Sequence, residues 1–484
     1  MASVFRWLDE RVNLRGAKRD LLDREVPDRL TWWHTLGSAT LTVFLVQLIS
    51  GVTLATYYSG SPDHAFESIQ FINRQVASGM LLRGMHHWGA SAMVVLIIAH
   101  VIRVFSVGAY KYPREVNWLV GVGLLVVVLA FSFTGYLLPW DQKAYWATAV
   151  GTNIAGTTPL VGGALVALLR GGSELGAATL ARFYAFHALW LPLLLTAFVA
   201  LHIIMVIRQG IAARPGALER GAPHSTADPA YPAYYKTAYA ATKRGGQRFW
   251  PDVLGKDAIV SAVVVIAIVA LGAAFGAPLE APADPTDTTY IPRPEWYFLP
   301  IYQLLKLVPG SFESVIAVGV PTALLLALVC LPFFDRGSTR NLLHRPVALV
   351  ALVFILAGSG LLIGAAGRAP TQTSDATEAL NSVQRAGRAL YQSQQCGGCH
   401  RIAGEGGDVG PDLSDVGARH SAGWIHSFIE LPSRFHAESR MPAYGPPTLS
   451  HQEIEELAQY LSSLEGAPGR QPHYYDSFPA PKQP

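Results

Sequence analysis

Long apolar blocks alternate with shorter polar segments along most of the chain. Each block is close to the roughly 20 residues that a membrane-spanning helix needs. Seven such blocks lie at about 33–58, 85–105, 116–138, 183–207, 257–277, 314–334 and 346–366. From about residue 367 onward the sequence is polar and contains no further block. The pattern predicts an all-α protein: a polytopic transmembrane bundle of about seven spans, followed by a small separate domain.

Composition supports a membrane protein. Of the 484 residues, 51% are hydrophobic and 15% are charged, and the mean hydropathy is +0.28. Soluble proteins carry charge on about a quarter of their residues, so this chain is poor in charge. The net charge is +3, and the sequence contains no basic run. We therefore expect a lipid membrane as the environment of the apolar blocks and no nucleic acid as a partner.

The charges between the blocks predict the orientation. Residues 1–30 have mixed charge and lack an apolar run, so they do not read as a cleaved signal peptide. If the N-terminus is cytoplasmic, the inside segments hold 21 Lys and Arg and the outside segments hold 7. This bias matches the positive-inside rule. An odd number of spans then places the C-terminal domain outside. We expect the spans to lie in the cytoplasmic membrane of a bacterial cell.

A haem attachment signature stands in the C-terminal domain. Cys396-Gly-Gly-Cys399-His400 has the spacing in which two thiols bond the haem vinyl groups and the histidine supplies an axial nitrogen. A disulfide or half of a zinc site is the alternative. A soft thioether is the expected second ligand of a high-potential haem, and Met441 is the only methionine of the domain. The rival ligands are His420, His426 and His436.

The same region resembles a class I cytochrome c over about 380–465. A segment at about 451–463 has apolar residues at helical spacing, and the turn Gly410-Pro411-Asp412-Leu413 follows the haem motif. The resemblance implies that the proline carbonyl orients His400. We expect a linker at 367–384, a small α-helical cytochrome c domain at 385–465 with one covalent haem c, and an extended tail at 466–484.

Four histidines fall inside two predicted spans, where ionisable residues are costly and tend to be functional. His86 and His100 are 14 residues apart, which turns a helix through about 1400°, about 40° short of four full turns. His187 and His202 are 15 apart, about 60° off alignment. His87 and His100 are 13 apart, about 140° off alignment, so His87 is expected to be an interfacial neighbour, although its sequence position alone does not exclude it as a ligand. Because both spans run from outside to inside, His86 is expected to pair with His187 near the outer surface and His100 with His202 near the inner surface.

Each pair is predicted to hold one b-type haem without a covalent bond. Hydrogen bonding of lone histidines across helices is the alternative. The two neighbouring spans carry glycines at the same spacing of 14, which would let a flat porphyrin approach the backbone: Gly37 and Gly51, and Gly121 and Gly135. Glycines also serve plain helix packing. Arg83 and Arg103 flank the second span and either pair with haem propionates or act as snorkelling anchors.

From about 30 to 365 the sequence resembles cytochrome b of the quinol:cytochrome c oxidoreductases. The resemblance rests on five motifs: Arg83-Gly-Met-His86, Lys111-Tyr-Pro-Arg-Glu115, Pro139-Trp-Asp-Gln142, Arg182-Phe-Tyr-Ala-Phe-His187 and Pro294-Glu-Trp-Tyr297. The second, third and fifth of these are called KYPRE, PWDQ and PEWY below. The chain resembles the plastid and cyanobacterial branch of this family in three features. These are PWDQ, the 15-residue histidine spacing and the three spans that follow the four-helix di-haem core. There the core and the remainder are usually separate chains. Here the core, 1–210, and the PEWY-containing part, 211–366, are fused.

The resemblance implies that PEWY marks the site where quinol is oxidised. Glu295 is expected to accept a quinol proton, and Tyr297 to hydrogen-bond the quinol or organise the loop. A plain carboxylate at a helix start is the alternative for Glu295. The remaining residues expected in the quinol-site loops are Pro139, Trp140, Asp141, Pro294 and Trp296.

The family also implies partners and a bifurcated reaction. One quinol electron would pass to a Rieske iron–sulfur subunit, which must be a separate chain because no Rieske cysteine–histidine pairs occur here. The other would cross the membrane through the two b haems to reduce quinone inside. The final acceptor would be a soluble or membrane cytochrome c or an oxidase, and a homodimer is implied. Weak inner-site candidates are Arg208, Asp28 and His34.

One departure concerns an extra inner haem that the related branch often attaches to a cysteine of the first span. Thr35 stands at about that position, and Cys330 is expected to be a packing residue, so we predict no covalent inner haem. Two other functions remain open. A di-haem conduit would wire quinone to the cytochrome c domain without bifurcation, and a docking or assembly subunit would only recruit soluble carriers.

Overall fold

The computed structural model describes most of the chain: residues 2–13, 15–16, 18, 22–285, 290, 293–309, 312–368, 382–402, 405–407, 409–436 and 439–464. The contacts divide the chain into two units. The first comprises 1–138, 148–278 and 294–369, and the second comprises 139–147, 279–293 and 370–484. Most of the predicted linker 367–384 and the whole predicted tail 466–484 lie outside the described residues.

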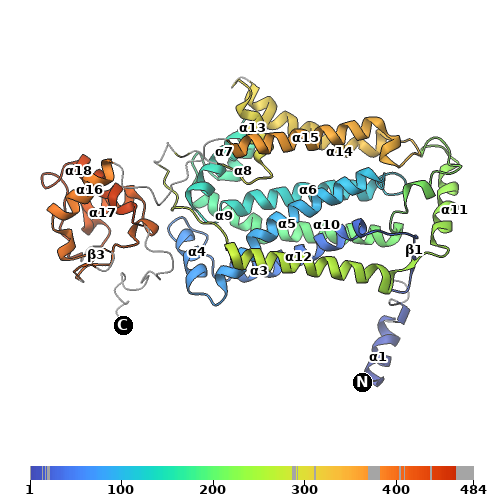
Figure 1. The fold of residues 1–484 in the computed structure, drawn as a ribbon, viewed down its shortest axis with the longest axis horizontal. Coiled ribbons are helices and arrows are strands. Elements are labelled where there is room, and N and C mark those ends of the chain that lie inside the picture. Colours follow the sequence, from blue (N-terminus) through green and yellow to red (C-terminus); the bar gives the residue numbers. More distant parts are fainter. Residues whose placement is uncertain are drawn as a thin grey trace. The chain divides into compact units, whose positions relative to one another are not determined.

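The seven predicted spans are confirmed. Helices long and apolar enough to cross a membrane cover Trp32–Ala55, Gly79–Ser106, Glu115–Tyr136, Ala177–Gln209, Phe249–Phe275, Val315–Phe334 and Pro346–Arg368. The second and fourth begin six residues before the apolar blocks did. Both helices include polar residues that precede the apolar block, such as Arg83 and Arg182. A polar residue interrupts the apolar pattern but not the helical hydrogen bonding. In the first unit the long helices run side by side (Figure 1).

Four spans form a bundle: α3 (Leu36–Ala55), α5 (Gly79–Ser106), α6 (Glu115–Tyr136) and the pair α9 (Ala177–Ala185) and α10 (Leu191–Gln209). One cluster of buried side chains fills its middle, with Val43, Phe44, Met93, Val94, Val127, Val128 and Leu195 from these helices and Ile268 from α12 (Leu254–Phe275). Each cluster residue from the four bundle spans lies roughly halfway between two glycines or two histidines of its own span. The apolar core therefore separates two polar levels.

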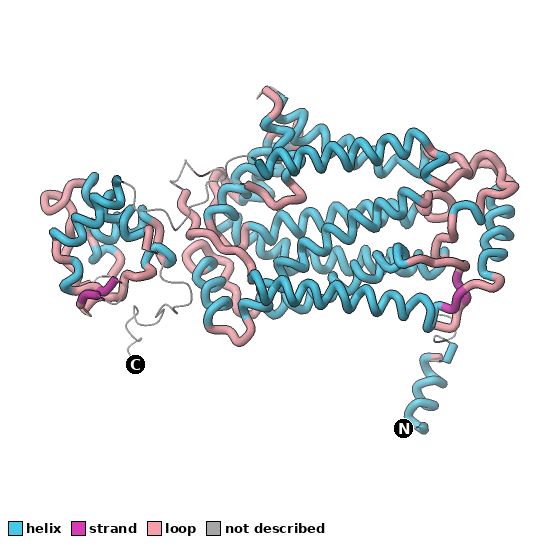
Figure 2. Tube along the Cα trace, in the orientation of Figure 1, coloured by secondary structure: helices cyan, strands magenta, loops and turns pink. Residues whose placement is uncertain are grey.

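The helices α14 (Val320–Phe334) and α15 (Pro346–Arg368) complete the spans. Shorter helices connect them: α1 (Ala2–Val12), α4 (Ala65–Arg74), α7 (Gln142–Gly156), α8 (Gly162–Arg170), α11 (Tyr231–Lys243) and α13 (Leu299–Lys306). The named strands of the described residues form only two antiparallel pairs, β1 (Glu25–Val26) with β2 (Gln247–Arg248) and β3 (Arg401–Ile402) with β4 (Glu405–Gly406) (Figure 2). The predicted all-α class is confirmed.

The cytochrome-c-like region packs α16 (Ser382–Ser393) and α17 (Ala422–Glu430) on α18 (His451–Ser462). Its core contains Ile425, Ile429, Ile454, Leu457 and Leu461. A Cβ at Gly387 of α16 would lie 1.9 Å from the Glu456 carbonyl oxygen of α18. Only glycine allows these two helices to approach this closely, so the residue fixes where they cross.

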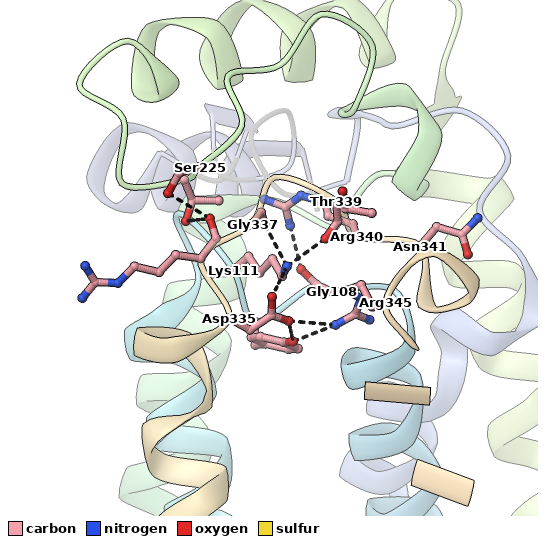
Figure 3. Close-up of polar contacts among 12 residues, drawn as sticks. Gly108, Lys111, Ser225, Asp335, Gly337, Thr339, Arg340, Asn341 and Arg345 are labelled. Atoms are coloured by element: carbon pink, nitrogen blue, oxygen red, sulfur yellow. Dashed lines mark hydrogen bonds and ion pairs between the residues drawn. The ribbon is translucent and has the colours of Figure 1, made fainter. Parts of the chain in front are cut away.

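A buried polar cluster, here called the Asp335 network, joins three connections at the end of the bundle where α14 leads into α15 (Figure 3). The ammonium of Lys111, which is 1% exposed, donates to Asp335 at 2.7 Å and to the Gly337 and Thr339 carbonyls at 2.8 Å. Arg345 also donates to Asp335, at 3.1 Å. The hydrogen bonds from Lys111 and Tyr110 outweigh the burial of Asp335 and hold its pKa below the ordinary value.

Candidate haem sites and quinol-oxidation loop

The structure brings the four span histidines together in two pairs. The ring centroids of His86 and His187 are 6.2 Å apart, and those of His100 and His202 are 6.5 Å apart. Two metal–imidazole bonds of about 2.0–2.1 Å, plus a nitrogen roughly 1 Å from each ring centre, add up to about 6–6.5 Å. The spacing of both pairs therefore fits one iron between each pair of rings. His87 instead packs edge-on against Trp88, with centroids 5.3 Å apart.

A π turn explains the unequal histidine spacings. The fourth span changes from α-helix to a π turn at η2 (Phe186–Trp190), which contains His187, and then continues as α10. A π turn closes an i→i+5 hydrogen bond and so takes up one residue more than an α turn. The 15 residues from His187 to His202 then turn like the 14 from His86 to His100. The 60° offset expected for an unbroken α-helix is corrected by this turn.

Each of the four predicted glycines lies against one of the four histidines. An ideal Cβ at Gly51 would be 3.1 Å from the His86 ring, and one at Gly135 would be 2.5 Å from the His187 ring. At the other level, a Cβ at Gly37 would lie 3.4 Å from His100 and one at Gly121 would lie 3.6 Å from His202. The missing side chains make room for the imidazoles themselves, most tightly at Gly135.

Hydrogen bonds fix which nitrogen of His86 and His187 faces the space between the rings. His86 Nδ1 lies 2.9 Å from the Ser50 hydroxyl. His187 Nδ1 lies 3.3 Å from the Thr134 hydroxyl and 3.2 Å from the Phe131 carbonyl. With Nδ1 protonated and bonded to the protein, Nε2 keeps its lone pair for a metal. In the described part of the chain, no group of three or more His, Cys, Asp or Glu side chains able to hold a metal ion occurs.

The two arginines beside the histidines differ in their surroundings. Arg83 is buried, and its guanidinium donates to the Ala277 carbonyl at 2.8 Å and the Pro278 carbonyl at 2.6 Å. It therefore ties the residues after α12 to α5. Arg103 lies one turn after His100 in the last turn of α5. A propionate-binding role remains a prediction for both residues.

The PEWY residues lie against the bundle core. Trp296 and Tyr297 pack on the same cluster as Phe44 and Val128. Burial and then the Glu295 carboxylate raise the pKa of the Tyr297 phenol above its ordinary range, and a hydrogen bond with Ser132 opposes this. Tyr297 therefore stays protonated near neutral pH and remains able to donate a hydrogen bond beside a carboxylate.

The PWDQ segment belongs to the second unit, where it is braced by its own hydrogen bonds. Asp141 Oδ1 accepts from the Ala144 amide at 2.8 Å, and Oδ2 accepts from the Glu280 amide at 3.0 Å. Trp140 is buried and packs edge-on against Tyr145. These contacts give Asp141 a structural task, capping α7 and holding the loop.

The haem motif of the C-terminal region has the expected support for its histidine. His400 Nδ1 donates to the Pro411 carbonyl at 2.9 Å, and a Cβ at Gly410 would be 2.4 Å from the His400 ring. Cys396 and Cys399 are free thiols on and just after the short helix η8 (Cys396–Gly398). With Nδ1 held by a carbonyl, Nε2 of His400 is the nitrogen left for iron.

Met441 packs against the core of this domain together with Cys396. Each of the three rival histidines has an aromatic neighbour instead. His420 stacks on Trp424 at 3.6 Å, and its pKa is lowered to about 4 by burial and Arg419. The other two neighbours are His451 beside His426 and Phe428 beside His436. The packing favours Met441 as the second ligand.

Comparison with known proteins agrees with this arrangement. The family model for the N-terminal part of cytochrome b/b6 matches residues 21–210, that for the C-terminal part matches 282–383, and that for cytochrome c matches 384–465. The menaquinol:cytochrome c reductase cytochrome b subunit of Geobacillus thermodenitrificans is 45% identical over 217 residues, which cover 43% of this chain and 97% of that protein. This chain belongs to the cytochrome b/b6 family.

Two further relatives support the assignment. Cytochrome b6 of Synechococcus elongatus is 42% identical over 212 residues, covering 44% of this chain and 99% of that protein. A solved hyperthermophilic respiratory Complex III chain matches with a TM-score of 0.64 and 29% identity, covering 75% of this chain and 91% of the other. The predicted resemblance and the prediction of an oxidoreductase subunit are confirmed. Cytochrome b and c domains in one membrane chain imply haem b and haem c.

Some residues of this cytochrome b were not recognised in the sequence. Ser50 and Thr134 directly precede Gly51 and Gly135. The sequence therefore contains two pairs of a hydroxyl residue and a glycine, of which only the glycines were predicted to be functional. The Asp335 network was also missed, although Lys111 lies in a motif quoted above. Among the weak inner-site candidates, the half-buried Asp28 forms ion pairs with the exposed Arg29 and Arg214, and Arg208 is exposed. Thr35 is buried and donates to the Trp32 carbonyl at 2.7 Å.

Proposed function

We propose that this chain is the cytochrome b/c subunit of a proton-translocating quinol:cytochrome c oxidoreductase. The observation that carries the proposal is the packing of Trp296 and Tyr297, which flank and follow Glu295 in PEWY, on the core of a bundle that aligns two histidine pairs. A conduit without quinol chemistry would need the histidine pairs but not this carboxylate and phenol.

The ligand set supports two non-covalent b haems and one covalent c haem. His86 and His187 would hold one b haem, His100 and His202 the other, and Cys396, Cys399, His400 and Met441 the c haem. When bound, these groups supply one-electron transfer, between the two b haems across the membrane and outward through the c haem. Ser50 and Thr134 orient the imidazoles of His86 and His187, and the buried apolar cluster of the bundle lies between the two levels.

Quinol oxidation releases two electrons and two protons and leaves quinone. Glu295 would accept one of these protons, because a carboxylate within reach of a hydroxyl is a suitable general base. Tyr297 would donate a hydrogen bond to a quinol oxygen, because its phenol is protonated near neutral pH. Pro294 and Trp296 would shape the pocket wall, and Pro139, Trp140 and Asp141 would belong to the quinol-site loops of the family motif.

The remaining features of the proposal follow from the family and the sequence. One electron of each quinol would leave through a separate Rieske iron–sulfur subunit, and a cytochrome c or an oxidase would accept it from this chain. We place the chain in a bacterial cytoplasmic membrane, with the N-terminus inside and the cytochrome c domain outside, in a homodimer. The 21-to-7 distribution of Lys and Arg between the two sides supports the orientation.

Oxidant-induced reduction of b haem tests the proposed reaction. In the purified complex with quinol and an inhibitor of inner quinone reduction, a pulse of oxidant should reduce b haem rather than oxidise it. This response requires that the two quinol electrons take different routes. If the oxidant leaves b haem unreduced, the chain is a conduit and the proposal is wrong.

A substitution tests the role of Glu295. Glu295→Gln keeps the shape but removes the base, so quinol-dependent reduction of cytochrome c should fall by about 10²-fold or more. Glu313→Gln, at an exposed glutamate in the same connection, is the matched control and should keep the rate. Equal rates in both variants would show that Glu295 is only a structural carboxylate.

A further inference from the structure

The His86–His187 level and the His100–His202 level share the same glycine spacing but differ in the residue that precedes each glycine. At the His86–His187 level, the residue before each glycine carries a hydroxyl, in Ser50-Gly51 and Thr134-Gly135. At the His100–His202 level, the corresponding pairs are Leu36-Gly37 and Val120-Gly121. In the part of the chain that the structure describes, neither His100 nor His202 bonds to a side-chain hydroxyl.

The direction of the two hydroxyl contacts follows from a count of hydrogens. Ser50 Oγ lies 2.7 Å from the Val46 carbonyl, and Thr134 Oγ1 lies 2.9 Å from the Ala130 carbonyl. A carbonyl can only accept, so the single hydroxyl hydrogen is used there. Each hydroxyl oxygen therefore accepts from the Nδ1–H of its histidine. Both hydroxyls are buried, at 2% and 5% exposure, so water does not compete for them.

The hydrogen-bond acceptors on Nδ1 are found at the His86–His187 level. Phe131, four residues before Gly135, presents its carbonyl to His187 Nδ1 at 3.2 Å. Asn117 stands four residues before Gly121, but among the described residues His202 Nδ1 is buried without a hydrogen-bond partner. The side-chain part of this difference is the hydroxyl acceptor that Ser50 and Thr134 supply. An acceptor on Nδ1–H makes the imidazole a more basic ligand, which favours the oxidised over the reduced state of a bound iron.

We infer that Ser50 and Thr134 are positioning residues that lower the reduction potential of the haem held by His86 and His187 relative to that held by His100 and His202. This inference rests on the proposed function, because it assumes a b haem at each level. Each haem takes up one electron, so a lower potential at the first level makes transfer of that electron to the second level downhill. The direction of electron flow would thus be set by two hydroxyls in a nearly symmetric bundle.

Redox titration of the two b haems in the purified complex tests this. Ser50→Ala should raise the midpoint potential of the lower-potential b haem by up to about 59 mV, the one-electron equivalent of a tenfold change in the equilibrium constant. The midpoint potential of the other b haem should not change. Ser50→Thr keeps the hydroxyl and should restore the original value. Thr42→Ala is the matched control, because this hydroxyl on the same helix bonds to Ser261 and not to a histidine.

A shape-matched exchange covers the case in which Ser50→Ala fails to assemble. Thr134→Val should raise the potential of the same haem, whereas Val120→Thr should lower that of the other. Two b haems with unchanged potentials, or with both shifted equally, would overturn the inference and leave the proposed function standing. A wild-type complex without two b-type haem signals would instead overturn the proposed function itself.

Discussion

In the membrane bundle each histidine pair joins α5 to the fourth span, and its glycines come from two further helices, α3 and α6. In the cytochrome c domain, Cys396, Cys399 and His400 lie within five consecutive residues. Yet Gly410 faces His400 as Gly135 faces His187, and in both places a hydrogen bond holds Nδ1. Both regions therefore support a ligand histidine in the same way. They differ in how the ligands are brought together, by helix packing in one and by local sequence in the other.

The largest effect should come from removing the local attachment. A variant with Cys396→Ala and Cys399→Ala should lose all haem that stays with the chain under denaturing electrophoresis, detected by haem stain. The b-haem spectrum of the native protein should remain, because those ligands are in another unit. Cys330→Ala is the control and should keep the stain. A stain that survives the double substitution would mean a covalent haem elsewhere.

The next effect separates tight from loose helix packing at the two histidine levels. A Cβ at Gly135 would be 2.5 Å from the His187 ring, a distance at which the ring must move, whereas one at Gly121 would lie 3.6 Å from His202, an ordinary contact. Gly135→Ala should therefore lose one of the two b haems, measured by haem content per chain. Gly121→Ala should retain both. Loss of one haem in both variants would show that the glycines make room for more than the imidazole.

Gly410→Ala extends the same comparison to the other region. Here a Cβ would be 2.4 Å from the His400 ring, so the axial bond should weaken. The thioether bonds should nevertheless keep haem on the chain, and the haem stain should be unchanged. A tight glycine would thus be needed for retention only where the haem is held by packing.

These contrasts indicate why the sequence predicts some features and not others. The covalent site is predictable because its ligands are contiguous. The histidine levels are predictable because straight helices convert a spacing of 14 into alignment. The π turn at His187 could not be foreseen, since it depends on backbone hydrogen bonds. The Asp335 network brings Lys111 beside a carboxylate more than two hundred positions later, and only the folded packing of α14 and α15 makes that pair adjacent.

A smaller effect tests whether the Asp335 network holds the bundle's helices together. Asp335→Asn would leave the buried Lys111 ammonium and Arg345 without a countercharge and should destabilise the protein by about 3–5 kcal/mol. The free energy of unfolding in detergent micelles measures this. Asp28→Asn, which breaks longer ion pairs with the exposed side chains of Arg29 at 3.8 Å and Arg214 at 3.6 Å, is the control and should cost at most about 1 kcal/mol. Equal costs would mean that the network adds no more than a surface pair.

The smallest effect concerns a helix cap of the cytochrome c domain. Ser450 Oγ accepts from the Glu453 amide at 3.3 Å, and the Glu453 carboxylate accepts in return from the Ser450 amide at 2.8 Å. Removing such a cap typically costs about 0.5–2 kcal/mol. For a domain of this size about 1 kcal/mol lowers the unfolding temperature by roughly 4–8 °C, so Ser450→Ala should show a shift of that order in the purified chain at pH 7.

The pH dependence of that shift distinguishes the reciprocal cap from a simple hydroxyl. Hydrogen bonds from the Ser450 amide and hydroxyl hold the pKa of Glu453 below its ordinary value of 4.5. A carboxyl whose pKa is lowered by folding adds stability above that ordinary value and loses it as the pH falls through the lowered one. The difference between wild type and Ser450→Ala should therefore shrink below about pH 4.5. A difference that stays constant down to pH 3 would show that the Glu453 carboxylate takes no part, and that the hydroxyl alone caps α18.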